Sequence, residues 1–218
     1  MKGALMQPRQ FNRAEHVYQN EAFTEMIKDA IRFFNGTPVI ELPPSERFAG
    51  AGIYALYYTG KYKPYAKYGE LNRLAYNHPI YVGKAVPKGW RQSGHSSGMG
   101  GNSSELHTRL REHFKSVTAT KNLDAADFAC RFTIMEGIAT DMIAAVEAAL
   151  IKHNRPLWNT IIDGFGNHDP GAGRAAGQKS KWDVLHPGRK WVERIADNPI
   201  SPKELLREIE AYLKGVGL

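Results

Sequence analysis

The chain has 218 residues, of which 42% are hydrophobic and 23% charged, so it can bury an ordinary core and is not globally disordered. Its single cysteine, Cys130, excludes an internal disulfide and a zinc site built from several thiolates. The net charge is +7, and the excess gathers in residues 59–121, which carry eleven basic and three acidic residues. Such a stretch is typical of a surface that binds a polyanion, although a solvated lysine-rich surface has the same composition.

No apolar run approaches the ~18–20 residues that a membrane helix needs. The N-terminal residues also lack the apolar core of a secretory signal. We therefore expect a soluble, cytoplasmic protein with no membrane partner.

The hydrophobic pattern predicts short strands and amphipathic helices without an internal repeat. Helices are indicated by apolar residues three and four apart, and strands by aromatic and aliphatic runs between glycines. In chain order we predict a helix over 14–34, a short extended piece before Pro43, a strand over 50–59, a long polar connection over 60–79, a strand over 80–82, a loop over 86–104, a helix over 104–117, a strand over 127–135, a helix over 138–153, a glycine-rich loop over 164–180 and a short helix from Pro202.

This order indicates a mixed α/β (α+β) fold, in which a small three-stranded, mainly antiparallel sheet is flanked by helices. The strands do not alternate with helices as a doubly wound parallel sheet requires. We expect one elaborated domain over 1–218, made of an N-terminal helical extension (1–48), a core (49–160) with insertions at about 60–79 and 86–104, and a C-terminal loop and helix (161–218).

Three familiar sequence motifs give little evidence of function here. Residues 171–176 fit the dinucleotide-binding pattern G-x-G-x-x-A, but no hydrophobic strand precedes them. His153, Asn154 and His168 only loosely resemble a His-Asn-His nuclease. No lysine has Asp or Glu two residues before it, so the D/E-x-K metal motif of many restriction nucleases is absent in its usual form.

Two tripeptides on the predicted strands carry the main functional signal. They are GIY at 52–54 and YVG at 81–83, and together they resemble the paired motif of the GIY-YIG nuclease superfamily, with Val in place of the middle Ile. That family also places an arginine on the next helix, a glutamate on a later helix and an asparagine soon after. The matching positions here are Arg109, Glu147 and Asn159, and the departures from the family are the long insertions between them.

The residues around these positions support the resemblance. Arg109 and His113 are four apart and share one helix stripe, although both could simply lie on the surface. Glu147 is the only charged residue between Asp141 and Lys152, on an apolar helix. A carboxylate there costs free energy unless it is paired or binds a metal, and the alternative is a solvent-facing helix surface rich in alanine.

The resemblance implies hydrolysis of a DNA phosphodiester bond. Glu147 would hold one divalent cation per active site, Mg²⁺ with Mn²⁺ as a possible substitute, and Arg109 would neutralise charge on the phosphoryl oxygens. Tyr54 would orient or deprotonate the attacking water; which of Tyr54, Tyr81 or His113 is the general base stays open. Asn159 either positions this network or a phosphate, or is only a cap. The expected catalytic residues are thus Tyr54, Tyr81, Arg109, His113, Glu147 and Asn159.

We expect the two insertions to form much of the DNA-binding surface. Lysines in the first one interleave with tyrosines, which could pack on sugars or bases or could cover the sheet. The expected DNA-binding residues are Lys61, Lys63, Lys67, Lys84, Lys88, Arg91 and Gln92.

Within the superfamily, a catalytic domain enlarged by basic insertions is most similar to a type II restriction endonuclease. The implied partner is double-stranded DNA, cut at a short palindromic site by a homodimer, with a cognate DNA methyltransferase implied genetically. The alternatives are a homing or repair-type GIY-YIG nuclease and a non-catalytic DNA-binding protein of the same fold.

Overall fold

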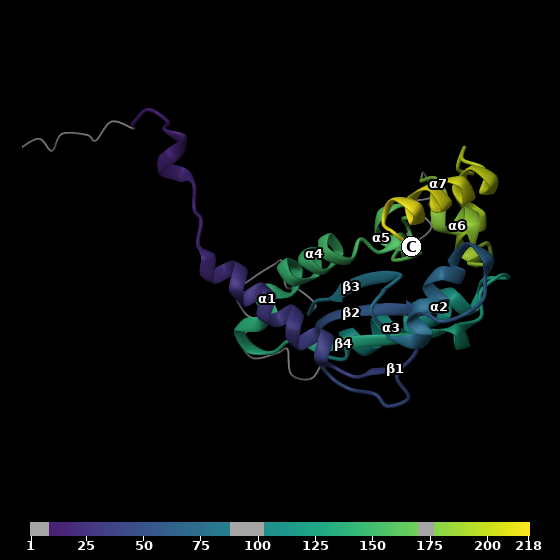
Figure 1. Cartoon of the computed structure of the whole chain (residues 1–218), viewed down its shortest axis with the longest axis horizontal. Helices are drawn as coiled ribbons and strands as arrows, with labels where there is room; N and C mark the ends of the chain where they lie inside the picture. The colour runs from purple at the N-terminus through teal and green to yellow at the C-terminus, as the bar shows by residue number, and fades with distance from the viewer. Residues whose placement is uncertain (1–8, 88–102, 170–176) are drawn as a thin grey trace, which may run out of the picture.

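The computed structural model describes residues 9–87, 103–169 and 177–218, which form a mixed α/β fold around one antiparallel sheet (Figure 1). The strands lie in the order β1-β4-β2-β3, and each neighbouring pair is antiparallel. Their bounds are β1 Val39–Glu41, β2 Gly52–Tyr58, β3 Tyr81–Ala85 and β4 Phe128–Ile134.

The prediction of three strands is wrong by one, because the extended piece before Pro43 is an edge strand. Strand β1 pairs with β4 in the register Val39↔Arg131, Ile40↔Cys130 and Glu41↔Ala129. Three residues are too few to show a periodic pattern, and the partner strand lies about ninety residues further along the chain. Local sequence therefore could not reveal this pairing.

Seven α-helices surround the sheet in the described residues. They are α1 Glu21–Gly36, α2 Ala66–Leu74, α3 Glu105–Thr118, α4 Ile143–Asn154, α5 Leu157–Thr160, α6 Lys181–Leu185 and α7 Pro202–Gly215.

Three of the predicted segments differ from the structure. The first helix starts at Glu21, because the Asn20 side chain caps it and a separate 3-10 turn holds Arg13–His16. The helix predicted over 138–153 starts as a 3-10 segment and becomes α-helical at Ile143. The connection over 60–79 is not irregular, since it contains a 3-10 turn and α2.

Strand β2 lies at the centre of the fold, and all seven of its residues are buried. Tyr54, Leu56 and Tyr58 face one core, to which α3 and the C-terminal segments contribute. The alternate residues Ile53, Ala55 and Tyr57 face a second core, formed with α1 and α4. A strand buried on both faces reads as a continuous apolar and aromatic run, which is why its sequence was recognisable.

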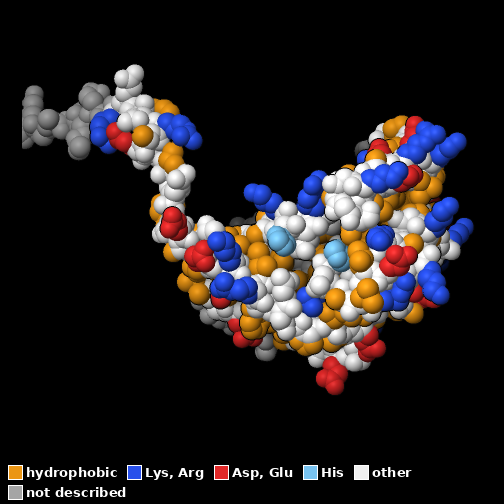
Figure 2. Space-filling model, viewed as in Figure 1, with side chains coloured by type: hydrophobic (Ala, Val, Ile, Leu, Met, Phe, Trp, Pro, Cys, Tyr) orange, Lys and Arg blue, Asp and Glu red, His pale blue; other side chains and the backbone are white. Residues whose placement is uncertain are grey.

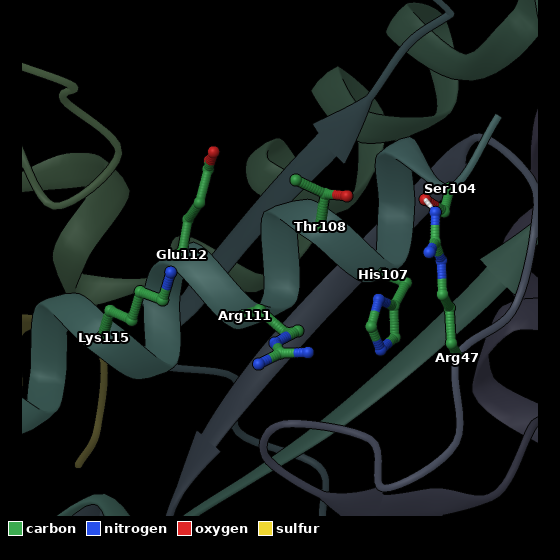
Figure 3. A pocket seen from close by; sticks show the side chains of 7 residues that line it. All are labelled: Arg47, Ser104, His107, Thr108, Arg111, Glu112 and Lys115. Carbon is green, nitrogen blue, oxygen red and sulfur yellow. Dashed lines mark hydrogen bonds between the residues drawn. The ribbon is translucent and has the colours of Figure 1, made fainter.

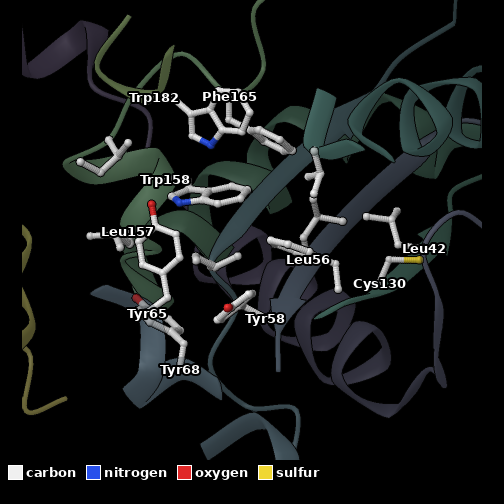
Figure 4. Packing of buried hydrophobic residues seen from close by; sticks show 14 of the residues in the cluster. Leu42, Leu56, Tyr58, Tyr65, Tyr68, Cys130, Leu157, Trp158, Phe165 and Trp182 are labelled. Carbon is white, nitrogen blue, oxygen red and sulfur yellow. The ribbon is translucent and has the colours of Figure 1, made fainter. Parts of the chain in front are cut away.

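The C-terminal residues belong to the first core. Trp158, Phe165 and Trp182 pack against one another, with ring centroids 4.5 to 5.7 Å apart, beside Tyr65 (Figure 4). Leu205 of α7 is fully buried in the same cluster. The segment after Asn159 thus lines the same side of the sheet as α3, where the candidate site lies.

Among the described residues, no helix combines the length and the apolar character that a membrane span requires.

Candidate active site

The two tripeptides lie side by side on β2 and β3, with Tyr54 directly opposite Gly83. A Cβ atom at Gly83 would lie 2.5 Å from the Tyr54 hydroxyl oxygen, so only glycine leaves room for this phenol. At Gly52 a Cβ atom would overlap the carbonyl oxygen of Thr133 on β4. Gly83 is therefore required by close packing against Tyr54, and Gly52 by the close approach of the β4 backbone.

The hydroxyl of Tyr54 is hydrogen bonded to His113 of α3, with 2.6 Å between Oη and Nε2. Tyr54 is fully buried and His113 is 1% exposed. Burial raises the pKa of Tyr54 well above that of a free phenol, and burial lowers the pKa of His113 well below that of free imidazole. Both groups are therefore neutral at pH 7, and the hydrogen bond between them satisfies two buried polar groups.

Tyr81 and Arg109 lie next to this pair. The Tyr81 ring is 6.2 Å from the Tyr54 ring and 5.2 Å from the His113 ring. Burial raises the pKa of Tyr81, as it does that of Tyr54. In both tyrosines the charge of Arg109 lowers the pKa and the charge of Glu147 raises it. The phenols therefore lie within the electrostatic reach of one cation and one carboxylate.

The guanidinium of Arg109 is held from two sides. It donates to Glu112 one turn along α3, at 3.0 Å, and to the carbonyl oxygen of Gly166 at 2.7 Å. The side chain is 18% exposed, so it is partly open to solvent while its direction is set.

Glu147 lies on α4, where its neighbours Ile143 and Leu150 are fully buried. Its carboxylate is 14% exposed and forms a close ion pair with the ammonium group of Lys84 on β3. The structure thus places Lys84, which the sequence assigned to a DNA phosphate, on the carboxylate proposed to hold a metal.

The donor set allows a metal site of only one kind. Within residues 9–87, 103–169 and 177–218, no three His, Cys, Asp or Glu side chains are grouped to hold a metal ion. A single carboxylate fits Mg²⁺, which usually keeps several waters and takes one or two protein carboxylates. Glu147 could fill this role, with Lys84 neutralising its charge in the absence of a cation.

Asn159 uses its whole amide on the backbone of β3. Its Oδ1 accepts from the Val82 amide at 2.8 Å, and its Nδ2 donates to the Val82 carbonyl oxygen, also at 2.8 Å. The neighbouring Trp158 amide donates to the carbonyl oxygen of Ile80 at 2.9 Å. Helix α5 therefore covers the open edge of β3, and Asn159 positions the strand that carries Tyr81.

Sequence analysis missed a third side of the site, the segment 164–168. Phe165 stacks on His113 with centroids 4.5 Å apart and planes 18° from parallel. Gly166 supplies the carbonyl oxygen that holds Arg109, and His168 contacts Arg109 and lies 3.6 Å from Glu112. Nothing in the sequence signals that this glycine-rich segment returns to α3.

Arg189 fixes that segment from behind. It is 5% exposed, pairs with Asp183 at 2.6 Å, and lies 4.7 and 4.8 Å from the centres of the Trp182 and Trp191 rings. Its guanidinium donates to three backbone carbonyl oxygens, those of Gly164, Phe165 and Asn167, at 3.0 to 3.2 Å. Only the planar fork of an arginine reaches so many acceptors at once.

The predicted DNA-binding residues are placed in part. Lys61, Lys63 and Lys67 are exposed, in and just before α2. Lys and Arg side chains are frequent at the end of the molecule where α2 lies (Figure 2). The interleaved Tyr65 and Tyr68 are buried in the core, so of the two roles left open for these tyrosines, they have the structural one. Lys88, Arg91 and Gln92 lie outside the described residues, as does the G-x-G-x-x-A motif at 171–176.

We predict that Arg189→Lys loosens the segment 164–168 while the protein stays folded. Lysine keeps the charge but cannot hold three carbonyl oxygens, so Phe165 should move off His113. The NMR signals of the His113 ring protons, shifted by the stacked Phe165 ring, should then move toward ordinary histidine positions.

The control is Leu205→Ala, which opens a cavity in the same core on α7, away from the hydrogen bonds of Arg189, and costs ~2–5 kcal/mol. It should lower the melting temperature without moving the His113 signals. Equal shifts in both variants would mean that the His113 signals report general stability, and Arg189 would then have no positioning role.

A comparison with protein-family models matches residues 46–213 to the Eco29kI GIY-YIG domain. A search of curated proteins finds no match. The matched range covers far more than half of the chain and includes every candidate catalytic residue described above. The resemblance to GIY-YIG nucleases is therefore confirmed: the chain belongs to the Eco29kI GIY-YIG family of type II restriction endonuclease domains.

Proposed function

We propose that this protein is a type II restriction endonuclease that cuts both strands of DNA at a short palindromic site, with one divalent cation, Mg²⁺, per active site. The family supports a DNA endonuclease, and one observation carries the proposal further. It is the buried hydrogen bond between Tyr54 and His113, beside Tyr81 and Arg109. The chain buries a second pair of this kind, Tyr65 and His186, so the feature that supports catalysis is the place of the Tyr54–His113 pair beside Tyr81 and the Arg109 cation.

The arrangement supports a simple proton path. An attacking water would give its proton to the Tyr54 oxygen as Tyr54 passes its own proton to Nε2 of His113. Arg109 would face the negative charge that grows on the phosphoryl oxygens. A cation at Glu147 would, when bound, polarise the scissile phosphate and stabilise the leaving oxygen.

A homing or repair-type nuclease of the same superfamily and a non-catalytic DNA-binding protein are the competing functions. Incubation with plasmid DNA and Mg²⁺ separates them. Discrete fragments support the restriction enzyme, a smear indicates a nonspecific nuclease, and binding without cutting indicates the non-catalytic protein. If the proposal holds, a cognate methyltransferase protects the host DNA in the cytoplasm without forming a stable complex.

We predict that Glu147→Gln abolishes plasmid cleavage, with a loss beyond the ~10–100-fold that follows removal of an outer-shell metal partner. The amide keeps the size of the side chain but removes the charge that would hold the cation. Mg²⁺ should raise the melting temperature of the parent protein and leave that of Glu147→Gln unchanged.

Lys84→Gln is the matched control, because it breaks the same ion pair and keeps the carboxylate. It should retain the Mg²⁺-dependent rise in melting temperature. If Glu147→Gln still cuts at the parental rate, or if both variants lose stability and Mg²⁺ has no effect on the parent, Glu147 is half of a structural pair.

We predict that Tyr54→Phe also abolishes cleavage, because it removes the hydroxyl that connects the water to His113. The buried Nε2 of His113 would lose its partner, at a cost of ~1–3 kcal/mol in the free energy of unfolding. Cleavage and thermal unfolding are measured on the same preparation.

The chain holds a close control for this variant. Tyr65 forms the same kind of buried bond to His186, also 2.6 Å between Oη and Nε2. Tyr65→Phe should cost a similar free energy and leave cleavage unchanged. If the two variants lose activity in proportion to stability, the Tyr54–His113 pair is structural.

The proposed homodimer has a candidate surface on the N-terminal arm, residues 9–33, part of which extends away from the body (Figure 1). On α1 the apolar side chains of Phe23, Met26 and Phe33 follow one face and are 55%, 50% and 64% exposed. Phe11 and Tyr18 before it are 74% and 75% exposed. Exposed apolar stripes of this kind mark interaction sites, and two active sites are needed to cut both strands of a palindrome.

We predict that the double variant Phe23→Ser, Met26→Ser nicks plasmid DNA but converts it to linear product at least ~10-fold more slowly, because paired cuts need two chains on one site. Analytical ultracentrifugation with duplex DNA should show two parent chains and one variant chain per duplex. Leu74→Ser, at a position 86% exposed on α2, is the control. Full double-strand cutting by a one-to-one complex would rule out the dimer.

A further inference from the structure

A hollow on the solvent side of α3 is lined mainly by basic side chains (Figure 3). Its volume is about 280 Å³, and it is formed by six residues in or just before α3 and by Arg47, which reaches over from the segment before β2 and donates to Ser104 at 3.2 Å. We call this surface the α3 groove; its lining residues are Arg47, Ser104, His107, Thr108, Arg111, Glu112 and Lys115.

The cations of the α3 groove are not neutralised by any described carboxylate. In the described part of the chain, Arg47, Arg111 and Lys115 form no ion pair, whereas exposed lysines elsewhere, such as Lys28 and Lys214, pair with glutamates one turn away. The one carboxylate in the groove, Glu112, is already bonded to Arg109. The groove therefore carries a positive excess.

Two further observations show that these cations act together. Burial lowers the pKa of His107, and the charges of Arg111 and Arg47 lower it further, so both reach its ring. Arg111 and Lys115 are four residues apart on α3, a spacing at which like charges repel each other. Uncompensated repulsion of this kind is relieved when an anion binds between the cations.

The groove adjoins the candidate active site. Glu112 lines the groove and also holds Arg109, so the two sites share a residue. From Arg109 to Lys115 the helix rises about 9 Å at 1.5 Å per residue. Along a DNA strand, which advances about 3.4 Å per nucleotide, this rise corresponds to two or three nucleotides.

We propose that the α3 groove binds backbone phosphates of the DNA strand whose scissile phosphate lies at Arg109. The proposal rests on the nuclease function proposed above and adds a surface that sequence analysis did not assign. Arginine forks and a lysine ammonium in an open hollow suit phosphate oxygens, which anchor a duplex without reading its sequence. The groove thus sets the register of the strand at the cut.

The test is the salt dependence of binding to a random-sequence duplex, measured by fluorescence anisotropy without divalent cations. The variant is the triple Arg47→Gln, Arg111→Gln, Lys115→Gln. Each lost phosphate contact lowers the slope of log K against log salt by about 0.9, so loss of two or three contacts lowers it by roughly 2–3. At low salt, the affinity of the variant for the duplex should be at least ~10-fold lower than that of the parent protein.

A charge-matched control removes three exposed cations from the C-terminal region, as Lys190→Gln, Lys203→Gln, Arg207→Gln. It lowers the net charge equally and should keep the parental slope. Melting temperatures of all three proteins should agree, since every substituted side chain in the two triple variants is exposed.

Each outcome has one meaning. If the groove variant binds with the parental affinity and slope, the proposed phosphate contacts of the groove are wrong. They are also wrong if the control variant weakens binding as much as the groove variant does, because net charge alone would then explain the effect. A parent protein that binds no duplex removes the proposed function and the groove with it.

Discussion

The candidate site depends on one buried hydrogen bond, between the Tyr54 hydroxyl and Nε2 of His113. Tyr54 is held by a central strand that is buried on both faces, and His113 by a helix docked on one of them. Because both groups are buried, each must stay neutral, and each satisfies the other. Gly83 leaves the space and Phe165 closes it, so the geometry of the pair is determined by four separate segments of the chain.

The segments around this pair are held in place by polar groups that do not themselves face the reaction. Asn159 completes the hydrogen bonding of the β3 edge, and Arg189 gathers three carbonyl oxygens of the segment that carries Phe165. Asn159 uses its amide on the β3 backbone, and Arg189 divides its donors between three backbone carbonyl oxygens and the carboxylate of Asp183. This arrangement makes the C-terminal residues part of the site, because they keep the aromatic side chains and Arg109 in fixed positions.

Charge is distributed unevenly around the neutral pair. Glu147 is already compensated by Lys84, and Glu112 by Arg109, whereas Arg47, Arg111 and Lys115 of the α3 groove form no ion pair with a described residue. The charge on the groove is thus unpaired, whereas the charges of Glu147 and Arg109 are paired and both reach the phenols of Tyr54 and Tyr81.

The sequence by itself determined the family, the mixed α/β class, and the strands and helices that carry Tyr54, Tyr81, Arg109 and Glu147, because each of these signals lies within a few residues. It left open the role of Asn159, indicated β1 only as an extended piece without a partner, and did not indicate α2, the return of segment 164–168 to α3 or the part played by Arg189. Most of these features depend on contacts between residues about twenty to ninety positions apart. Helix α2 depends instead on the burial of Tyr65 and Tyr68, which the polar composition of the stretch does not reveal. Only the tertiary structure decides them, because hydrophobic periodicity reports which face of an element is buried and carries no information on which distant segment covers it.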